Sequence, residues 1–477
     1  MGPAEPLMAT ATLKIERMTP GGQGLGRADG GRVCFVPYTA PGDIVSAEIL
    51  RVHSGYAEAR LLEVREPGAS RVVPRCPLHF RPEGTGGPAV PCGGCDWQHL
   101  SSQAQLESKR EVIRDCLYRI AKLRSPRVRD TLPSPEPWRY RNKVQVPFGT
   151  GPGGKIVAGF FAPHSHRIVD FDDCWVQTEL SVRIALKVKE LAGRLGWAVY
   201  DEDRDRGWLR HLFIRTNREG RALVALVTRT PDFPKLEPFL DALCGDFQDI
   251  AGVFQNLQPL KTNVVLGPEW RRLRGAERIE ERVGPLRLQI SPAAFLQVNT
   301  PACEVLYGAA QELLTRGDFR PTLALDLYSG VGSVALWISG SAERVLGVEE
   351  NRDAVTDAWE NARSNGVRNI RFLAGTVESQ LRRIREILAG LPPGSAAAVL
   401  DPPRSGCSKP ALKALLDEAI GRVVYISCNP ATFARDADWL CRHHWTLSEV
   451  QPVDLFPQTS HVELVGLFER TACPQRS

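Results

Sequence analysis

From Thr322 onward the chain alternates short apolar runs with amphipathic segments, and this pattern constrains its fold more than any other feature. The apolar runs are 323–327, 345–348, 370–373, 397–400 and 423–426. At 352–364, apolar side chains recur at the spacing of one helical face, which predicts a helix. Strands that alternate with helices in this way form a parallel, doubly wound α/β sheet. Such a sheet binds its ligands at the carboxyl ends of its strands.

The first predicted strand is followed by a glycine-bearing turn, where α/β sheets bind nucleotides. Residues 326–332 have the sequence Asp-Leu-Tyr-Ser-Gly-Val-Gly, and glycine lets the backbone approach a ligand closely. Glu349 ends the second strand, where an acidic side chain binds the ribose hydroxyls of a nucleotide. From this segment alone, an NAD-dependent dehydrogenase and an S-adenosylmethionine enzyme both remain open. The alternative for Glu349 is a solvated carboxylate at a strand end.

Cys428 directly follows the fifth predicted strand, in the sequence Tyr-Ile-Ser-Cys-Asn-Pro at 425–430. This places a thiol at the mouth of the sheet, where a helix N-terminus would lower its pKa. Taken alone, a cysteine at a strand end is more often a buried core residue. Two other segments change that interpretation, Asp-Pro-Pro-Arg at 401–404 and Asp-Leu-Phe-Pro-Gln-Thr-Ser-His-Val-Glu at 454–463. Together the three segments supply a nucleophile and, in Glu463, a carboxylate suited to act as a base.

These segments resemble the RNA uracil-C5 methyltransferases, which use S-adenosylmethionine as methyl donor. The matching residues are Asp401 to Arg404 with Gly406, Tyr425 to Pro430 with Thr432, and Asp454 to Glu463. The resemblance points away from a dehydrogenase. It implies that Cys428 is the nucleophile and Glu463 the base, and it implies cofactor contacts at Gln297, Tyr328, Glu349 and Asp401.

The implied chemistry explains why a thiol and a carboxylate belong together. Uracil C5 is a poor nucleophile, but addition of a thiolate at C6 makes the ring an enolate whose C5 attacks the methyl group. A base must then remove the C5 proton so that the thiolate can leave, and burial that raises its pKa improves such a base. Asp401 or Arg404 would orient the ring or stabilise the enolate oxygen. The target uridine must be unstacked.

Residues 10–67 contain short strands separated by Gly and Pro turns, a pattern typical of a small β-barrel. We expect strands at 13–16, 33–36, 44–49 and 57–62, and a glycine-rich loop at 20–26. The glycine-rich loop and the Pro-Gly-Asp turn at 41–43 resemble a TRAM domain, an OB-like RNA-binding barrel. Further along, 97–124 has helical spacing. Residues 125–290 alternate strands and loops around a helix near 179–195, which predicts a mixed, mostly antiparallel domain.

Four of the twelve cysteines have the pattern of a metal site: Cys76, Cys92, Cys95 and Cys174. In a cytoplasmic protein, cysteines are free thiols or metal ligands more often than they form disulfides, so a group without a metal stays an alternative. Four thiolates suit either zinc or a 4Fe–4S cluster, and the resemblance favours 4Fe–4S. The chain departs from the family pattern through an insert at 81–91, which lengthens the separation between Cys76 and Cys92.

Composition sets broad limits on the partners of the chain. The net charge of +5 permits RNA binding without requiring it. Arginines from 204 to 221, with Trp208 and His211, form a candidate surface for single-stranded RNA, and the alternative is a solvated strand face. No apolar run reaches the roughly 18 residues of a membrane span, and the first residues lack a signal-peptide layout. We therefore expect a cytoplasmic monomer with no membrane partner.

The sequence thus predicts three domains and one activity. The domains are a TRAM barrel at 1–67, an iron–sulfur-bearing central domain at 68–290 and a Rossmann-like methyltransferase domain at 291–477, against which the helix 97–124 is a candidate to pack. The expected activity is methylation of a uridine in RNA to 5-methyluridine, with 23S ribosomal RNA as the favoured target. The alternatives are a transfer RNA T-loop methyltransferase and a non-catalytic RNA-binding protein.

Overall fold

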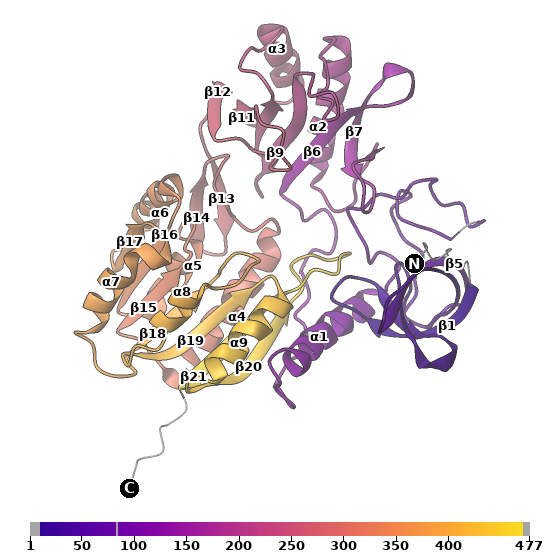
Figure 1. Ribbon diagram of the computed structural model, residues 1–477. Helices are drawn as coiled ribbons and strands as arrows, with labels where there is room; N and C mark the ends of the chain where they lie inside the picture. The colour runs from indigo at the N-terminus through magenta and orange to yellow at the C-terminus, as the bar shows by residue number, and fades with distance from the viewer. Residues whose placement is uncertain (1–9, 83, 471–477) are drawn as a thin grey trace. The chain divides into compact units, whose positions relative to one another are not determined.

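The computed structural model describes residues 10–82 and 84–470 (Figure 1). The described residues divide into two compact units. Unit 1 comprises the described parts of 1–108, 137–279 and 457–460, and unit 2 those of 109–136, 280–456 and 461–477. The domain boundaries given by the sequence stay predictions. No described helix is both long enough and apolar enough to cross a membrane.

The first five strands of unit 1 form the predicted small barrel, which Figure 1 shows as a closed ring. They are β1 (Thr10–Met18), β2 (Gly24–Arg27), β3 (Val33–Val36), β4 (Ile44–Val52) and β5 (Tyr56–Glu66). Their order is β1-β2-β3-β5-β4, and β4 pairs with β1 to close the ring. Alternate side chains such as Leu13, Val36 and Val45 fill the interior, as the period of a strand requires.

The prediction of a loop over the whole of 20–26 is wrong, because β2 begins at Gly24 and pairs with both β1 and β3. Glycine is needed there for close packing rather than for a turn. A Cβ at Gly26 would lie 2.9 Å from the carbonyl oxygen of Lys14, and one at Gly24 would overlap the side chain of Thr39. Glycine inside a strand marks such a close approach.

The central part of unit 1 is a seven-stranded sheet of order β12-β11-β10-β9-β6-β7-β8. Its strands are β6 (Lys143–Thr150), β7 (Ile156–Phe161), β8 (Ile168–Asp170), β9 (Leu209–Thr216), β10 (Ala222–Thr228), β11 (Ile250–Leu257) and β12 (Glu269–Gly275). The helices α2 (Glu179–Arg194) and α3 (Leu236–Asp246) share one hydrophobic core with this sheet. Only the β10–β11 pair among the described strands of the sheet is parallel, so the expected mostly antiparallel domain is confirmed.

The arginine-rich segment around β9 does not form one exposed surface. Arg210 is 3 % exposed and donates hydrogen bonds to the carbonyl oxygens of Gln258 and Leu260, at 2.8 and 2.6 Å. Its guanidinium also lies 4.4 Å from the ring centre of Tyr200. Trp208 is buried as well. These side chains hold the domain together, and the surface proposed for them from sequence is wrong at its centre.

Unit 2 contains the second seven-stranded sheet, of order β17-β16-β15-β18-β19-β21-β20. The strands are β15 (Leu323–Leu327), β16 (Arg344–Glu349), β17 (Ile370–Ala374), β18 (Ala396–Leu400), β19 (Ile420–Ser427), β20 (Trp445–Val453) and β21 (Glu463–Arg470). β15 to β19 are parallel, whereas β21 is antiparallel to both β19 and β20. This confirms the predicted doubly wound sheet. A short β13–β14 pair (Ile279–Val283 and Leu286–Ile290) precedes it.

Helices cover both faces of this sheet. α4 (Thr300–Thr315), α5 (Ser333–Trp337) and α6 (Arg352–Ser364) share one core with it. α7 (Val377–Leu388), α8 (Lys409–Ala414), α9 (Pro430–Cys441) and the end of α1 (Ser102–Arg119) share the other. α1 is shorter than the predicted 97–124. The hydroxyl of Ser101 accepts a hydrogen bond from the N–H of Ala104, at 3.3 Å, and a serine cap of this kind begins a helix.

The start of β4 depends on one buried carboxylate, that of Asp43. It accepts hydrogen bonds from the N–H groups of Ala40 (2.6 Å) and Gly68 (2.9 Å), and Arg71 Nε donates to it at 3.0 Å. The side chain of Asp43 is fully buried. Asp43 therefore joins the turn before β4 to the segment that follows β5.

We predict that Asp43→Ala lowers the free energy of unfolding by about 3 kcal/mol, because it leaves Arg71 and two N–H groups without their buried partner. Denaturant unfolding followed by circular dichroism measures the change. The exposed Asp29→Ala is the control and should stay within about 0.5 kcal/mol of the parent protein. Equal stability of the two variants would contradict the role given to Asp43.

Candidate active site

Cys428 lies in the short loop between β19 and α9, at the carboxyl end of its strand. The side chain of Asn429 caps α9 by accepting hydrogen bonds from the N–H groups of Ala431 (3.1 Å) and Thr432 (3.4 Å). On the other side of Cys428, the Ser427 hydroxyl accepts the N–H of Asn429 at 3.2 Å. Both neighbours thus fix the loop, and Cys428 itself stays half-buried.

The same loop is bonded to the Asp-Pro-Pro-Arg segment that follows β18. Asn429 Nδ2 and Thr432 Oγ1 both donate to the carbonyl oxygen of Arg404, at 3.1 and 3.2 Å. Gly406 has a φ of +78°, and a Cβ there would lie 2.6 Å from Asp436 Oδ2. These contacts explain why the asparagine, threonine and glycine accompany the cysteine in sequence. The sequence analysis quoted them without assigning this positioning role.

Glu463 is the first residue of β21 and is 2 % exposed. Its Oε2 atom is buried and has no hydrogen-bond partner among the described residues. Burial raises the pKa of Glu463 well above its usual range, and the nearby carboxylate of Asp401 adds to the rise, while Arg404 opposes it. A raised pKa is the direction that suits a base.

Cys428, Glu463 and Asp401 share one electrostatic environment. Burial raises the pKa of Cys428 to about 11, with the carboxylates of Glu463 and Asp401 contributing and Arg404 opposing. The expected lowering of this pKa by the helix N-terminus is therefore wrong, because burial and two acidic neighbours outweigh it. Burial also raises the pKa of Asp401 to about 7. Asp401 is therefore the member of this group whose pKa lies near neutral pH.

The segment that leads to Glu463 is anchored residue by residue. Lys109 in α1 forms a buried ion pair with Asp454 and donates to the carbonyl oxygen of Phe456 at 3.0 Å. Pro457–Ser460 belongs to unit 1. There the carbonyl oxygen of Gln458 accepts the N–H of Trp97 at 3.0 Å, and Ser460 N–H donates to Asp96 Oδ1 at 2.8 Å.

A second group of predicted residues lies at the ends of β15 and β16. Glu349 Oε2 accepts the N–H of Gly330 at 2.9 Å, and Oε1 accepts the N–H of Asn351 at 2.8 Å. Tyr328 has a φ of +73°, a costly conformation that concentrates at functional sites. Gly330 also has a positive φ, and a Cβ added there would meet no atom within 4 Å. The backbone turn therefore borders open space beside Glu349.

Two more residues complete this side of the sheet. Gln297 is buried in the segment before α4. Asn299 fixes that segment by donating to the carbonyl oxygen of Leu455 at 2.9 Å and to the Ser134 hydroxyl at 3.1 Å. Asp326 in β15 is fully buried, and burial raises its pKa to about 8. The sequence analysis gave Asp326 no role, although an acid within an otherwise apolar strand was a visible signal.

The four predicted cysteine ligands lie in unit 1 and act on one another electrostatically. Burial raises the pKa of Cys92 to about 11, and Cys174 and Cys76 add to the rise. The pKa of Cys95 is raised by burial and by the same three thiols. Gly94 N–H donates to Cys92 Sγ at 3.4 Å. Within 10–82 and 84–470, however, no group of three or more His, Cys, Asp or Glu side chains has the spacing to hold a metal ion.

Comparison with known proteins agrees with this arrangement. Residues 278–471 match the family model described as tRNA (Uracil-5-)-methyltransferase, and residues 9–62 match the TRAM domain. The chain is 38 % identical over 465 residues to an uncharacterized RNA methyltransferase of Halalkalibacterium halodurans, covering 96 % of each. The chain belongs to the S-adenosylmethionine-dependent RNA (uracil-C5)-methyltransferases.

Two further similarities place this methyltransferase among its relatives. It is 36 % identical to an uncharacterized RNA methyltransferase of Gloeobacter violaceus, covering 97 % of each chain. It is also similar to the crystal structure of the Pyrococcus abyssi tRNA (uracil-54, C5)-methyltransferase in complex with S-adenosyl-L-homocysteine. That match has a TM-score of 0.73 and 26 % identity, and it covers 96 % of this chain and 100 % of the other. The predicted TRAM barrel and Rossmann-like methyltransferase fold are confirmed.

We predict that the Cys428 thiol of the free enzyme reacts slowly with iodoacetamide near pH 8 and that its rate rises as the pH approaches about 11. The thiolate is the reactive form, and a raised pKa keeps its fraction small at neutral pH. Glu463→Gln removes one carboxylate that raises this pKa, so its profile should shift to lower pH.

Peptide mass spectrometry after timed alkylation measures the rate at Cys428, and free glutathione serves as the reference thiol. An inflection below that of glutathione would contradict the raised pKa.

Proposed function

We propose that this methyltransferase transfers a methyl group to C5 of a uridine in 23S ribosomal RNA through a covalent bond between Cys428 and C6 of the base. The observation that carries the proposal is the placement of Cys428, Glu463 and Asp401 together at the carboxyl edge of the sheet, each with a raised pKa. An RNA-binding protein without catalysis would not require three acidic groups with raised pKa values in one place.

In the proposed reaction, the Cys428 thiol passes its proton to a neighbouring carboxylate, and its sulfur bonds to C6 as the C5–C6 double bond opens, which makes the uracil ring an enolate. Bound S-adenosylmethionine would supply an electrophilic methyl group, which C5 takes up as the bond from that methyl group to the sulfonium sulfur breaks. Glu463 then takes the C5 proton, and the bond between sulfur and C6 breaks as the ring regains its double bond. No donor among the described residues occupies the buried Oε2 of Glu463, so this oxygen is available to accept that proton. Division of one difficult step into these easier ones is covalent catalysis.

Arg404 is suited to stabilise the enolate oxygen of the base. It is the cationic group that opposes the rise in pKa at both Cys428 and Glu463, so it acts on the same small volume. Its Nη2 lies 3.4 Å from the imidazole Nδ1 of His461. A guanidinium that faces a developing negative oxygen lowers the barrier through oxyanion-type stabilisation.

We propose that Gln297, Tyr328, Glu349 and Asp401 contact S-adenosylmethionine. The strongest support is at Glu349, whose carboxylate is held beside Gly330 where the backbone borders open space. An acid at this strand end is suited to bind ribose hydroxyls. The glycine leaves the room that an adenosyl group needs.

We propose a 4Fe–4S cluster on Cys76, Cys92, Cys95 and Cys174, with zinc as the alternative. The mutual effects of the four thiols support a common site, and an N–H directed at Cys92 Sγ suits a thiolate ligand. A 4Fe–4S cluster is held by four cysteine thiolates, which is the number of thiols in this group.

One other substrate, transfer RNA, is favoured by an observation of its own. The similar Pyrococcus abyssi enzyme acts, by its name, on uracil 54 of transfer RNA, which favours a transfer RNA substrate. The support for 23S ribosomal RNA comes from the sequence resemblance. The combination of a TRAM barrel with the cysteine pattern resembles the branch of the family that acts on 23S ribosomal RNA. The expected cytoplasmic location and monomeric state stay predictions.

We predict that the wild-type protein labels 23S ribosomal RNA and leaves transfer RNA unlabelled when methyl-labelled S-adenosylmethionine is supplied. Cys428→Ala should lower the rate by at least about a thousandfold, as expected when a nucleophile is lost. Glu463→Gln should accumulate a protein–RNA adduct that survives a denaturing gel, because the C5 proton stays in place.

Glu350→Gln is the matched control, since Glu350 is exposed and adjoins Glu349 in sequence, and it should methylate normally. If only transfer RNA carried the label, transfer RNA and not 23S ribosomal RNA would be the substrate. If Cys428→Ala kept a tenth of the wild-type methylation rate, the covalent mechanism through Cys428 would be wrong.

We predict that protein purified without oxygen carries about four iron atoms per chain. Cys92→Ser should lose this iron and lower the melting temperature, because energy from a structural metal site is folding energy. The control is Cys244→Ser, which changes a half-buried thiol of α3 and should keep the iron. Metal analysis and visible absorption provide the readout, and stoichiometric zinc in the wild-type protein would contradict the cluster.

A further inference from the structure

A segment outside the predicted motifs extends the sheet of unit 2 beyond β20. Val128 and Leu132 pair with Val450 and Val453 of β20 in parallel fashion. The N–H of Leu132 donates to the carbonyl oxygen of Pro452 at 3.0 Å. Val453 is in turn the partner of Glu463 in β21. Residues 126–132 therefore run along the edge of the sheet. The last of them, Leu132, lies beside Val453, which is the direct strand partner of the proposed base Glu463.

This segment and α1 form a groove of about 590 Å³. Its lining includes four arginines, of which Arg110 and Arg114 come from α1 and Arg127 and Arg129 from the segment. Asp130 is the single acidic residue of the lining, and no aromatic side chain contributes to it. We name this surface the arginine groove.

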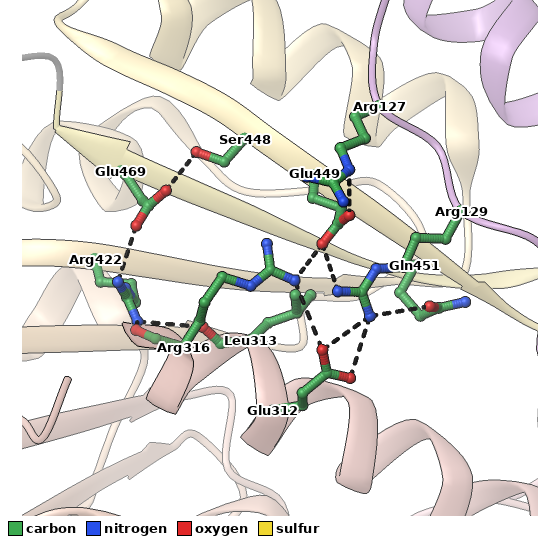
Figure 2. Close-up of polar contacts among 10 residues, drawn as sticks. All are labelled: Arg127, Arg129, Glu312, Leu313, Arg316, Arg422, Ser448, Glu449, Gln451 and Glu469. Carbon is green, nitrogen blue, oxygen red and sulfur yellow. Dashed lines mark hydrogen bonds and ion pairs between the residues drawn. The ribbon is translucent and has the colours of Figure 1, made fainter. Parts of the chain in front are cut away.

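A buried carboxylate under the groove holds two of its arginines. Glu449 in β20 is fully buried and pairs with Arg127 Nε at 2.8 Å and Arg129 Nη2 at 2.7 Å. Figure 2 shows the guanidinium of Arg316 reaching the same carboxylate, with Glu312 bridging Arg129 and Arg316. Burial acts to raise the pKa of Glu449, but hydrogen bonds from Arg129 and Arg316 hold it below its usual value. The carboxylate thus stays charged and fixes the cations above it.

Arg127 combines this fixed position with an open face. Its side chain is 75 % exposed, and within the described parts of the chain its Nη atoms have no partner. The side chain of Arg114 is 41 % exposed and pairs with Glu111 through Nη1 at 2.9 Å. An ordered guanidinium loses little further entropy when it binds an anion, and its fork matches the oxygens of a phosphate.

We propose that the arginine groove binds the phosphate backbone of the RNA that flanks the target uridine. The five arginines of this cluster outnumber the four acids that pair with them, Glu111, Asp130, Glu312 and Glu449, and the Nη atoms of Arg127 face outward, which favours an anion. The lack of aromatic rings in the lining disfavours stacking on bases, so the contact carries position rather than sequence. The groove leads along β20 to the strand end beside Glu463, which gives a bound strand a direction towards the site. This inference rests on the proposed function, because it takes RNA as the substrate.

The test measures RNA affinity separately from chemistry. A short fluorescent single-stranded RNA of mixed sequence is titrated with the full-length protein at several KCl concentrations. We expect Arg114→Ala and Arg127→Ala each to raise Kd by about three- to tenfold and to reduce the slope of log K against log salt by about 1. The double variant should show both effects combined, with a raised KM for RNA and an unchanged kcat.

The matched control is Arg382→Ala. Arg382 lies in α7 near the other end of the sheet, is 93 % exposed and pairs with Glu386, as Arg114 does with Glu111. It should leave affinity and salt slope unchanged. Arg114→Ala and Arg382→Ala should melt as the wild type does. In Arg127→Ala, Arg129 and Arg316 still pair with Oε2 of Glu449 while Oε1 loses its partner, so every titration is run well below the melting temperature of each variant.

Unchanged Kd and salt slope in the double variant, with normal melting, would overturn the proposal. A drop in melting temperature with unchanged RNA affinity would also overturn it and make the cluster structural. Failure of the proposed function has a different signature, since a wild-type protein that binds RNA and methylates none would still show the effect of the groove variants.

Discussion

One carbonyl oxygen, that of Arg404, holds the candidate active site together. Asn429 and Thr432 both donate to it, so the loop after β18 and the loop after β19 form one piece. The first loop carries Asp401 and Arg404, and the second carries Cys428. Without this joint, two adjacent parallel strands would still end at one edge, but their loops would be free to separate. The pKa shifts at Cys428 and Glu463 depend on that closeness.

The acidic groups of the candidate active site, Cys428, Glu463 and Asp401, all ionise less readily than they would in water. The three acids lie close together, burial raises the pKa of each, and Arg404 is the cation that offsets the rise at Cys428 and Glu463. A thiol with a pKa near 11 is inert towards most small electrophiles at neutral pH. The arrangement becomes useful when a substrate brings a group that can accept negative charge. The thiol then reacts only when a substrate is bound, and between turnovers Cys428 is protected from small electrophiles.

The sequence predicted most of unit 2 because hydrophobic periodicity controls a buried parallel sheet. The run 323–327 coincides with β15, and 352–364 coincides with α6. Prediction failed where packing overrides composition, as at β2, whose glycines indicated a loop but allow close strand approach. It failed again for the direction of the Cys428 pKa. A helix N-terminus is visible in sequence, whereas the approach of Glu463 from a strand about 35 residues later depends on tertiary structure. The raised pKa of Asp326 and the role of Glu449 depend on burial, which the sequence does not show.

The four residues Pro457–Ser460 have a consequence for how such chains can be recombined. They lie within the span of the methyltransferase family model, 278–471, yet their compact unit is the other one. Their hydrogen-bond partners Asp96 and Trp97 directly follow Cys95 in the chain. A chimera could join the catalytic half of one relative to the amino-terminal half of another. Its residues at 457–460 would then meet partners at 96 and 97 that come from a different protein, and this mismatch would lie only three residues before Glu463. The two halves are therefore expected to be inherited as one linked unit, and the limits of the sequence family do not mark a transferable module.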